Sequence, residues 1–425
     1  MLNPSFFPHM KHLLATLLGL ATLAAAPAES GPVATSINTF GLELHRRLAA
    51  EGGNQVTSPW SIESALAMTW AGAANQTRAE MQTVLHLPPD GAAVHAGFAG
   101  LAADLAALAQ KSQERVKTAR KLGGPATPLE INTANRLFGD QHYPFEKPFL
   151  ALTGKSYGAP LEPMNFRKSP EAARTRINGW VASQTKDRIP ELIPGGVIDK
   201  DTRLVLANAI YLKAPWAEEF REEPNAPFFV NGTQPVQISG LVREGRFGYE
   251  KLPGGMAVTI PYADAGLQFV LFVPSAKDGL SALEMKLTPQ LLAKTAQAEG
   301  RDILLHFPAF KLEPGRVLLS ENLIAMGMPS AFNRPAGSAD FSGIAPRKPD
   351  DYLYLSQVIH QAFIAVDKHG TEAAAATAVV MMRAVSIPLE KPKPLEIRVD
   401  RPFAFAIQHQ ASGTCLFLGR VTDPR

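Results

Sequence analysis

Apolar residues recur at helical spacing in the first half of the chain, and this pattern predicts two long helices, over residues 61–84 and 171–192. Ser58 and Pro59 stand immediately ahead of the first segment and form a typical helix start signal. The apolar positions of the two helices are Ile62, Leu66, Met68 and Met81 in the first and Ile177, Trp180 and Val181 in the second.

Strand-like runs, rich in β-branched and aromatic residues, dominate the second half of the chain. These runs cover residues 204–212, 267–273, 303–312, 360–367, 395–409 and 414–421. Helices that come first and strands that come afterwards favour an α+β fold over an alternating α/β fold. The chain has neither an internal repeat nor a clean linker, so we expect one large domain.

One segment, residues 370–383, fits neither pattern. It begins with glycine, contains no proline, carries one acid, Glu372, and is otherwise small or β-branched until two methionines and an arginine. Because proline cannot donate to a sheet ladder, a proline-free segment of this kind suits the interior of a sheet. Pro388, Pro392 and Pro394 follow it and suit an exposed, extended tether. The segment therefore has the composition of a strand that lies outside its sheet.

Residues 372–378 also fit a short helix, because alanine is the best helix former. Two observations oppose that interpretation: the segment has no apolar stripe at helical spacing, and the valines that follow favour a strand. At about 3.3 Å per residue, residues 370–383 would span about 46 Å as a strand. One face of that strand, small enough to slide under a covering helix, would carry Thr371, Ala373, Ala375, Thr377 and Val379, and the opposite face Glu372.

Composition narrows the function classes only a little. With 425 residues the chain can bury a large core, and its 46% hydrophobic and 19% charged content is ordinary for a globular protein. Length alone would suggest two or three domains. The net charge is only +3, so no global field indicates a nucleic acid or a membrane as partner.

The N-terminus has the pattern of a secretory signal peptide over residues 1–28. Lys11 and His12 precede an apolar run, and Ala26-Pro27-Ala28 offers a cleavage site between small residues. Initiation at a second methionine, ten residues in, would give a more typical leader, and a buried apolar helix is the alternative. We expect residues 29–425 to be exported to the periplasm or the extracellular medium. No other run is expected to be long enough to cross a bilayer.

The single cysteine, Cys415, excludes an intramolecular disulfide, and its apolar neighbours predict a core position. No cysteine follows the leader, so a bacterial lipid anchor is excluded as well. The sequence has no His-Glu-x-x-His motif, no cysteine pair, no P-loop and no dinucleotide fingerprint. We therefore expect neither a metal nor a cofactor.

Residues 154–158 match the Gly-x-Ser-x-Gly nucleophile elbow of hydrolases around Ser156. That motif requires a strand before the serine and a helix directly after it. The glycine and proline that follow oppose such a helix, and His306, His360 and His409 all lie in strand-like runs instead of loops. A hydrolase is thus the weakest of the functions that we consider.

A local basic cluster ends in a Gly-Gly break and lies partly on one face of a predicted helix. It could bind a polyanion such as a glycosaminoglycan or a nucleic acid, although a solvated helix face is the simpler interpretation. The cluster consists of Lys111, Arg115, Lys117, Arg120 and Lys121.

Several motifs, taken in order, resemble the serpin family over nearly the whole chain after the leader. Each motif is modest alone, but their order and spacing are highly specific. They are Ser58-Pro59-Trp60-Ser61-Ile62 with Gly72-Ala73 and Thr77; Ile177-Asn178-Gly179-Trp180-Val181 with Thr185 and Ile189; Leu206-Ala207-Asn208-Ala209-Ile210-Tyr211-Leu212-Lys213 with Trp216 and Phe220; Asp340-Phe341-Ser342-Gly343-Ile344; Arg401-Pro402-Phe403-Ala404-Phe405-Ala406-Ile407; and Phe417-Leu418-Gly419-Arg420-Val421.

The resemblance implies a serpin fold, with three β-sheets surrounded by about nine helices and an exposed reactive-centre loop at about residues 368–394. It implies a monomer that is no enzyme but a suicide-substrate inhibitor of serine, or also cysteine, proteases. In such proteins the cleaved loop inserts as a strand into the central sheet and distorts the attached protease. The alternative within the family is a non-inhibitory serpin that acts as a binding or carrier protein.

The resemblance also assigns site residues. The proline-free start of residues 370–383 matches an inhibitory hinge, and a second set matches the shutter, where the sheet opens. Two departures occur at the breach near Trp216: the family usually has glutamate where this chain has Lys368, and a basic residue where it has Ala309. Both members of an ion pair are thus replaced, and we expect other contacts to hold the hinge. The hinge residues are Gly370, Thr371, Glu372, Ala373, Ala374, Ala375 and Ala376, and the shutter residues are Ser58, Ser61, Asn208 and His360.

The scissile bond stays open between two main alternatives. The usual distance from the hinge predicts cleavage at Ala384–Val385, which suits an elastase-like protease, and a loop one residue shorter predicts cleavage at Arg383–Ala384, which suits a trypsin-like protease. Met382–Arg383 is a third alternative, for a chymotrypsin-like protease. The alanine-rich leader and the absence of disulfides lean towards a bacterial source.

Overall fold

The computed structural model describes residues 31–121, 127–230, 232, 234–264, 266–313, 315–372 and 392–425. The predicted signal peptide, residues 1–28, lies outside the described residues. So do Ala373, Ala374, Ala375, Ala376, Arg383, Ala384 and Val385.

Nine α-helices occur in the described part of the chain. They are α1 (Pro32–Ala49), α2 (Pro59–Ala71), α3 (Asn75–Val84), α4 (Gly91–Lys121), α5 (Lys147–Tyr157), α6 (Pro170–Gln184), α7 (Leu280–Glu284), α8 (Pro289–Thr295) and α9 (Ser320–Met326).

The strands fall into three sheets among the described residues, and the predicted α+β class is confirmed. The nine-stranded sheet contains β1 (Gln55–Thr57), β5 (Arg221–Phe228), β6 (Val236–Leu252), β7 (Gly255–Pro261), β8 (Leu267–Pro274), β9 (Gly300–Pro308), β15 (Leu395–Arg398), β16 (Phe403–His409) and β17 (Thr414–Val421). The six-stranded sheet has the order β10 (Phe310–Leu312), β13 (Ile364–Val366), β14 (Gly370–Thr371), β4 (Leu204–Pro215), β2 (Glu130–Asp140) and β3 (Leu161–Met164), and β11 (Val317–Leu318) pairs with β12 (Ile359–His360).

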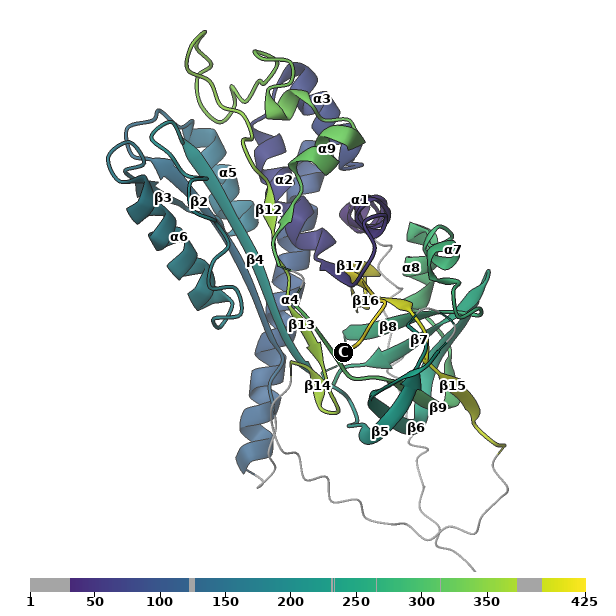
Figure 1. Ribbon diagram of the computed structural model, residues 1–425. Helices are drawn as coiled ribbons and strands as arrows, with labels where there is room; N and C mark the ends of the chain where they lie inside the picture. The colour runs from purple at the N-terminus through teal and green to yellow at the C-terminus, as the bar shows by residue number, and fades with distance from the viewer. Residues whose placement is uncertain are drawn as a thin grey trace, which may run out of the picture.

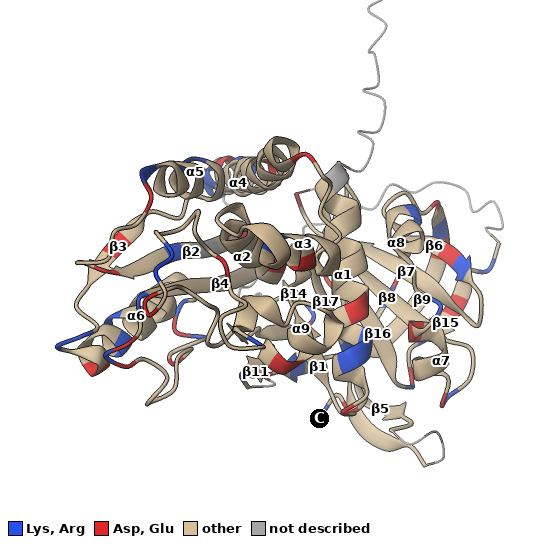
Figure 2. Ribbon diagram, turned by 90° about the horizontal axis from the view of Figure 1, so that it is seen from above, with Lys and Arg blue, Asp and Glu red and all other residues tan. Residues whose placement is uncertain are grey.

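The six-stranded sheet lies between two helical layers. Helices α4 and α5 lie on one side of β2 and β4, and α6 covers the other side (Figure 2). Ile177 on α6 packs in one apolar cluster with Ala207 and Ala209 of β4. Ile210 and Leu212 of β4 belong to the main core instead, together with residues of α2. The alternation along β4 therefore separates a face towards α6 from a face towards α2.

The helix predicted over residues 61–84 is in fact two helices, α2 and α3. Ser58 caps α2, because its hydroxyl oxygen accepts a hydrogen bond from the backbone N–H of Ser61. Gly72 ends the helix where the chain passes so close to Ile344 that a Cβ atom would lie 2.2 Å from that side chain. This contact is non-local, so the apolar period alone did not reveal the break.

The helix predicted over residues 171–192 ends early, at Gln184. The Thr185 hydroxyl donates to the carbonyl of Val181 and accepts from the backbone N–H of Ile189, which turns the chain back on itself. Lys186 and Asp187 take positive φ angles of 51° and 60° in this turn. The connection from α6 to β4 is therefore a loop, which buries Ile189, Leu192 and Ile198 but is otherwise largely exposed, and not a continuation of the helix.

Three long strand predictions are also split. Residues 303–312 divide into β9 and β10, residues 360–367 into β12 and β13 with β12 starting one residue earlier, and residues 395–409 into β15 and β16. Proline at the end of β9 cannot continue the ladder, which explains the first division. The remaining strand predictions correspond to β4, β8 and β17.

Helix α4 is, by length and composition, able to cross a membrane, and it is the one such helix in the described ranges. The expectation that no run outside the leader is long enough to cross a bilayer is therefore wrong. One side of α4, however, is buried against the rest of the protein. Its buried residues are Val94, Phe98, Leu101, Leu105, Ser112 and Val116.

Candidate functional site

Strand β4 has an open edge inside the six-stranded sheet. On one side it pairs with β2 from Leu204 to Lys213, and on the other side β14 pairs with only Ala214 and Pro215. Along the rest of that second side, β4 has no strand partner among the residues that the structure describes. Residues 353–363, which lead into β13, lie opposite (Figure 1). Unpaired backbone of this kind is a template for an added strand.

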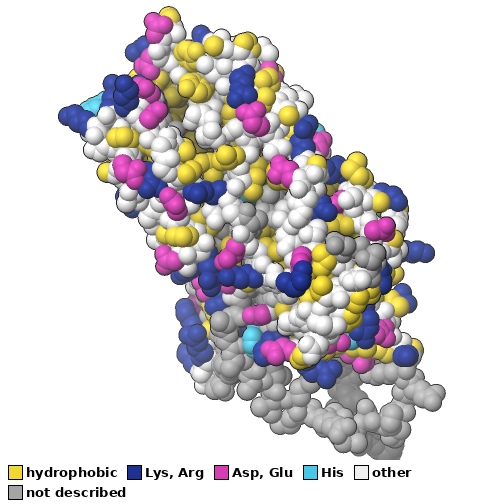
Figure 3. All heavy atoms as spheres, viewed as in Figure 1, with side chains coloured by type: hydrophobic (Ala, Val, Ile, Leu, Met, Phe, Trp, Pro, Cys, Tyr) yellow, Lys and Arg dark blue, Asp and Glu magenta, His cyan; other side chains and the backbone are white. Residues whose placement is uncertain are grey.

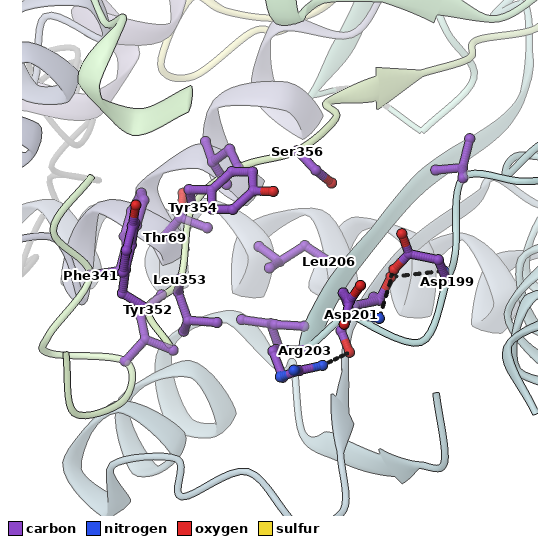
Figure 4. A pocket seen from close by; sticks show the side chains of 15 residues that line it. Thr69, Asp199, Asp201, Arg203, Leu206, Phe341, Tyr352, Leu353, Tyr354 and Ser356 are labelled. Atoms are coloured by element: carbon purple, nitrogen blue, oxygen red, sulfur yellow. Dashed lines mark hydrogen bonds between the residues drawn. The ribbon is translucent and has the colours of Figure 1, made fainter. Parts of the chain in front are cut away.

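A cavity separates the open edge of β4 from residues 353–360. Ile62 and Leu66 of α2 line it on one side, and Leu192 and Ile198 of the α6–β4 connection also border it. It continues into a second hollow beside the first residues of β4, where Leu206 lines both. In that hollow Phe341, Tyr352 and Tyr354 lie on one side and Asp199 and Asp201 on the other (Figure 4).

The hinge has already joined the sheet at the other end of this edge of β4. Gly370 pairs with Pro215 and Thr371 with Ala214, and both hinge residues are buried. A Cβ atom at Gly370 would lie 2.2 Å from the carbonyl oxygen of Ala214, so only glycine fits at that position. The Thr371 hydroxyl lies 2.5 Å from the buried hydroxyl of Tyr262. The predicted hinge thus begins inside the sheet.

Glu372 marks the point where this pairing ends. Its backbone N–H donates to the carbonyl of Ala365, but its φ angle of 49° is unusual for a residue with a side chain. The carboxylate accepts a hydrogen bond from the guanidinium of Arg188, in the connection that follows α6. Burial raises the pKa of Glu372, and Arg188 opposes that shift.

The breach residues lie around the approach to the hinge. Trp216 stacks on Tyr262 with ring centroids 4.8 Å apart. Its indole N–H donates to the carbonyl of Asp367 at 2.9 Å, and its backbone N–H donates to the carbonyl of His369 at 2.9 Å. These two hydrogen bonds fix the backbone on either side of Lys368, immediately before the hinge.

Two other ion pairs lie near Lys368, where the ion pair usual in the family is absent. Lys368 lies 2.7 Å from a carboxylate oxygen of Glu222, and the ring of His369 lies 2.9 Å from Glu219. Ala309 has no charge to offer and joins the ladder only through its backbone N–H, which donates to a carbonyl at 2.9 Å. That these contacts hold the hinge stays a prediction, which Lys368→Glu tests.

The four shutter residues meet in one hydrogen-bonded cluster. The backbone N–H of Ser58 donates to Nε2 of His360 at 3.1 Å, and the Ser61 hydroxyl donates to the side-chain oxygen of Asn208. Burial lowers the pKa of His360 to about 4, so its ring is neutral near pH 7 and can accept that bond. The cluster ties α2 to both borders of the cavity, because Asn208 is on β4 and His360 on β12.

Some residues of the site gave no usable signal in the sequence. Asn135 on β2 accepts a hydrogen bond from the amide of Asn208, and its one hint is an asparagine within a strand. Tyr262, Glu222 and Arg188 contact the hinge from distant parts of the chain, so no local pattern could have found them.

The basic cluster on α4 does not form one free surface. Arg115 pairs with Asp264, and Lys117 lies 2.7 Å from Glu114. At 100° per residue, Lys111 and Arg115 lie about 40° apart around the helix, whereas Arg120 lies on the opposite side from Lys111. Charges of both signs are interspersed over the face shown in Figure 3.

Ser156 is not a nucleophile elbow. It lies in the last turn of α5, and Gly158 follows as a left-handed cap with a φ angle of 59°. The motif needs a strand before the serine, and here a helix precedes it.

A central sheet with an open inner edge, and a chain segment that enters it at one end, defines a protein that accepts an added strand. The family model "Serpin (serine protease inhibitor)" matches residues 35–424 of this chain. The chain belongs to the serpin family. Because serpins are protease inhibitors and not catalysts, the hydrolase interpretation is excluded.

Relatives and solved structures agree with this family. The leukocyte elastase inhibitor of Bos taurus is 37% identical over 383 residues, which cover 88% of this chain and 93% of that protein. Serpin B10 of Rhinolophus ferrumequinum is 33% identical over 402 residues, 92% and 98% of the two chains. Cleaved serpin 42Da has a TM-score of 0.77 at 30% identity and covers 93% and 99% of the chains. Uncleaved ovalbumin has a TM-score of 0.73 at 26% identity, with 93% and 100% covered.

These relatives bear on the expected source. They come from mammals and give no support to a bacterial origin. The bovine protein is named an inhibitor, and neither name carries a statement about export.

Proposed function

We propose that this protein inhibits serine proteases by inserting its cleaved reactive-centre loop beside β4. The observation that carries the proposal is the open edge of β4 with the hinge already paired at its end. Each backbone group on that edge gains a hydrogen-bond partner when a strand is added. Cleavage by the protease releases the loop, and insertion then becomes the downhill step.

The register of the inserted strand follows from the pairing of Thr371 with Ala214. Continued one residue at a time, that pairing sets Thr377 opposite Asn208 on the face towards α2. Ala376 and Ala378 then lie opposite Ala209 and Ala207, which pack against α6. The face that passes under the covering helix is therefore the one with Glu372, Ala374, Ala376 and Ala378. The sequence analysis predicts the opposite face, with Thr371, Ala373 and Ala375, at this position.

The target follows from the relatives. Several relatives are leukocyte elastase inhibitors, and an elastase-like protease prefers a small residue before the scissile bond. We therefore favour Ala384–Val385 as the reactive bond and keep Arg383–Ala384 for a trypsin-like target. A hinge of small residues favours inhibition over the non-inhibitory alternative, because bulky or proline-rich hinges would obstruct insertion.

The remaining parts of the proposal concern the setting. We propose export of residues 29–425 as a monomer after removal of the leader, on the strength of the apolar run and its cleavage site. A polyanion site at the end of α4 would use Arg120 and Lys121, because Arg115 and Lys117 already have acidic partners and Lys111 lies on the opposite side of the helix from Arg120. The rate of protease inhibition, measured with and without a heparin-like polymer, tests this site. A change in that rate would indicate that α4 binds the polymer.

The test is incubation with an elastase and with trypsin, followed by denaturing electrophoresis and mass spectrometry of the released fragment. A covalent complex that survives denaturation is expected, with a fragment that begins at Val385 or Ala384. Cleavage without a complex would instead identify a non-inhibitory serpin. Cleaved protein should also melt at a markedly higher temperature, and an unchanged melting temperature would contradict insertion.

A further inference from the structure

We propose that Arg188 is a positioning residue that sets the register of the inserting strand, by holding Glu372 on the face of the sheet towards α6. This inference rests on the proposed function. It concerns the choice between the two faces of the strand, which a one-residue slip would reverse.

The loop itself carries little information about that choice. Positions 373–376 are four identical alanines, so a slip of one residue exchanges equivalent side chains there. Strands without a distinct inner and outer face have weakly specified register. The register must therefore come from the residues that enter first, Gly370, Thr371 and Glu372.

Thr371 and Glu372 are anchored on opposite faces. Thr371 points into the core, where its hydroxyl meets the fully buried hydroxyl of Tyr262 at 2.5 Å. Glu372 points to the α6 side, where it meets Arg188. A one-residue slip would bring the carboxylate of Glu372 to the buried Tyr262 and expose the threonine. Burial of an unpaired carboxylate is costly, so the two anchors together exclude the slipped register.

Arg188 is itself held in place by its surroundings. Its backbone N–H donates to the carbonyl of Thr185 at 3.0 Å, and the next residue, Ile189, is buried. Its guanidinium also lies over the ring of Phe363, 5.1 Å from the centroid. Arg188 belongs to the α6–β4 connection, and its side chain contacts both Phe363, in the segment opposite β4, and Glu372 of the hinge.

The chain offers a matched control in the same loop. Lys186 is a cation two residues away, and it lies 3.9 Å from Glu130 without contacting Glu372. A general loss of positive charge near the hinge would affect both variants. A loss of register control would affect the Arg188 variant only.

The experiment measures how many inhibitor molecules are consumed per protease inactivated, with Arg188→Ala and Lys186→Ala beside the wild type. We expect Arg188→Ala to raise the ratio of cleaved to trapped inhibitor, which is this stoichiometry minus one, about five-fold, a partition change of the size of one partly buried ion pair. Lys186→Ala should leave it unchanged. The rate of loop cleavage should be the same in all three proteins, because Arg188 acts after the cut. Equal stoichiometry for the two variants would overturn the proposal.

A second arm separates positioning from a merely structural role. In Glu372→Gln the partner charge is absent, so adding Arg188→Ala should raise the stoichiometry no further; independent, multiplying effects would contradict the proposal. If the wild type forms no covalent complex with any protease, the proposed function fails. Insertion can then be measured as the rise in melting temperature that follows cleavage of the loop. This rise should be smaller for Arg188→Ala than for Lys186→Ala. Equal rises in the two variants would overturn the inference.

Discussion

Glu63 offers the sharpest test of how burial controls this protein's stability. It lies on α2, two residues after Ser61 of the shutter, and it is completely buried. Neither carboxyl oxygen has a hydrogen-bond partner within the described residues. Burial raises the pKa of Glu63 well above its usual value, and a weaker interaction with the Ser36 hydroxyl opposes this shift. The folded protein therefore holds a proton at Glu63 that the unfolded chain releases above about pH 4.3.

The sign of the pH effect follows from that difference in bound protons. With the folded pKa raised, stability is greatest below the unfolded pKa and falls as the pH rises towards the folded pKa. The slope for one proton is about 1.4 kcal/mol per pH unit. Between pH 5 and pH 7, Glu63 should thus cost the protein up to about 3 kcal/mol. Glu63→Gln keeps the shape of the side chain and cannot ionise, so it should remove this slope.

The assay is guanidinium-induced unfolding of the wild type and Glu63→Gln at several values between pH 5 and pH 7. The difference between the two proteins is the informative quantity, because His95, His360 and Glu372 titrate in both. The variant should gain on the wild type steadily as the pH rises. Glu63→Met, which replaces the buried acid by an apolar side chain, should do the same. Parallel pH profiles for all three proteins would refute the assignment of a buried proton to Glu63.

Three further substitutions test the hinge and the shutter. Gly370→Ala should lower the melting temperature by several degrees, because the new Cβ collides with the carbonyl of Ala214; an unchanged melting temperature would mean that the hinge leaves the sheet easily. Asn208→Ala leaves the Ser61 hydroxyl without its acceptor and should cost about 1–3 kcal/mol in guanidinium unfolding, and a neutral effect would argue against the shutter network. Lys368→Glu removes the ion pair to β5 and should not raise the melting temperature; a marked rise would show that the glutamate usual in the family holds the hinge better.

Local signals predicted those parts of the fold that local forces build. Ser58 and Pro59 start α2 as expected, because capping and a fixed φ angle act within one turn. The end of α2 was missed, because Gly72 stops it through a contact with Ile344, far along the chain. Likewise, α6 stops at Thr185, where the hydroxyl turns the chain back.

The candidate site divides in the same way. The family motifs predicted the four shutter residues and the hinge, and the structure brings the predicted shutter residues into one cluster. The partners that hold the hinge, Tyr262, Glu222 and Arg188, come from separate elements and carried no motif. Pairwise contacts between distant segments depend on the packing of whole layers, so no spacing within the sequence encodes them.

The segment from Gly370 to Arg383 separates what the sequence determines from what only the tertiary structure determines. Its freedom from proline and its small side chains are properties of the sequence alone, and they suffice to predict a strand that can enter a sheet. Alternation divides such a strand into two faces, but it does not say which face meets the covering helix. Only the tertiary structure decided that, because the packing of α6 on Ala207 and Ala209 and the pairing of Thr371 with Ala214 together give each face its neighbour.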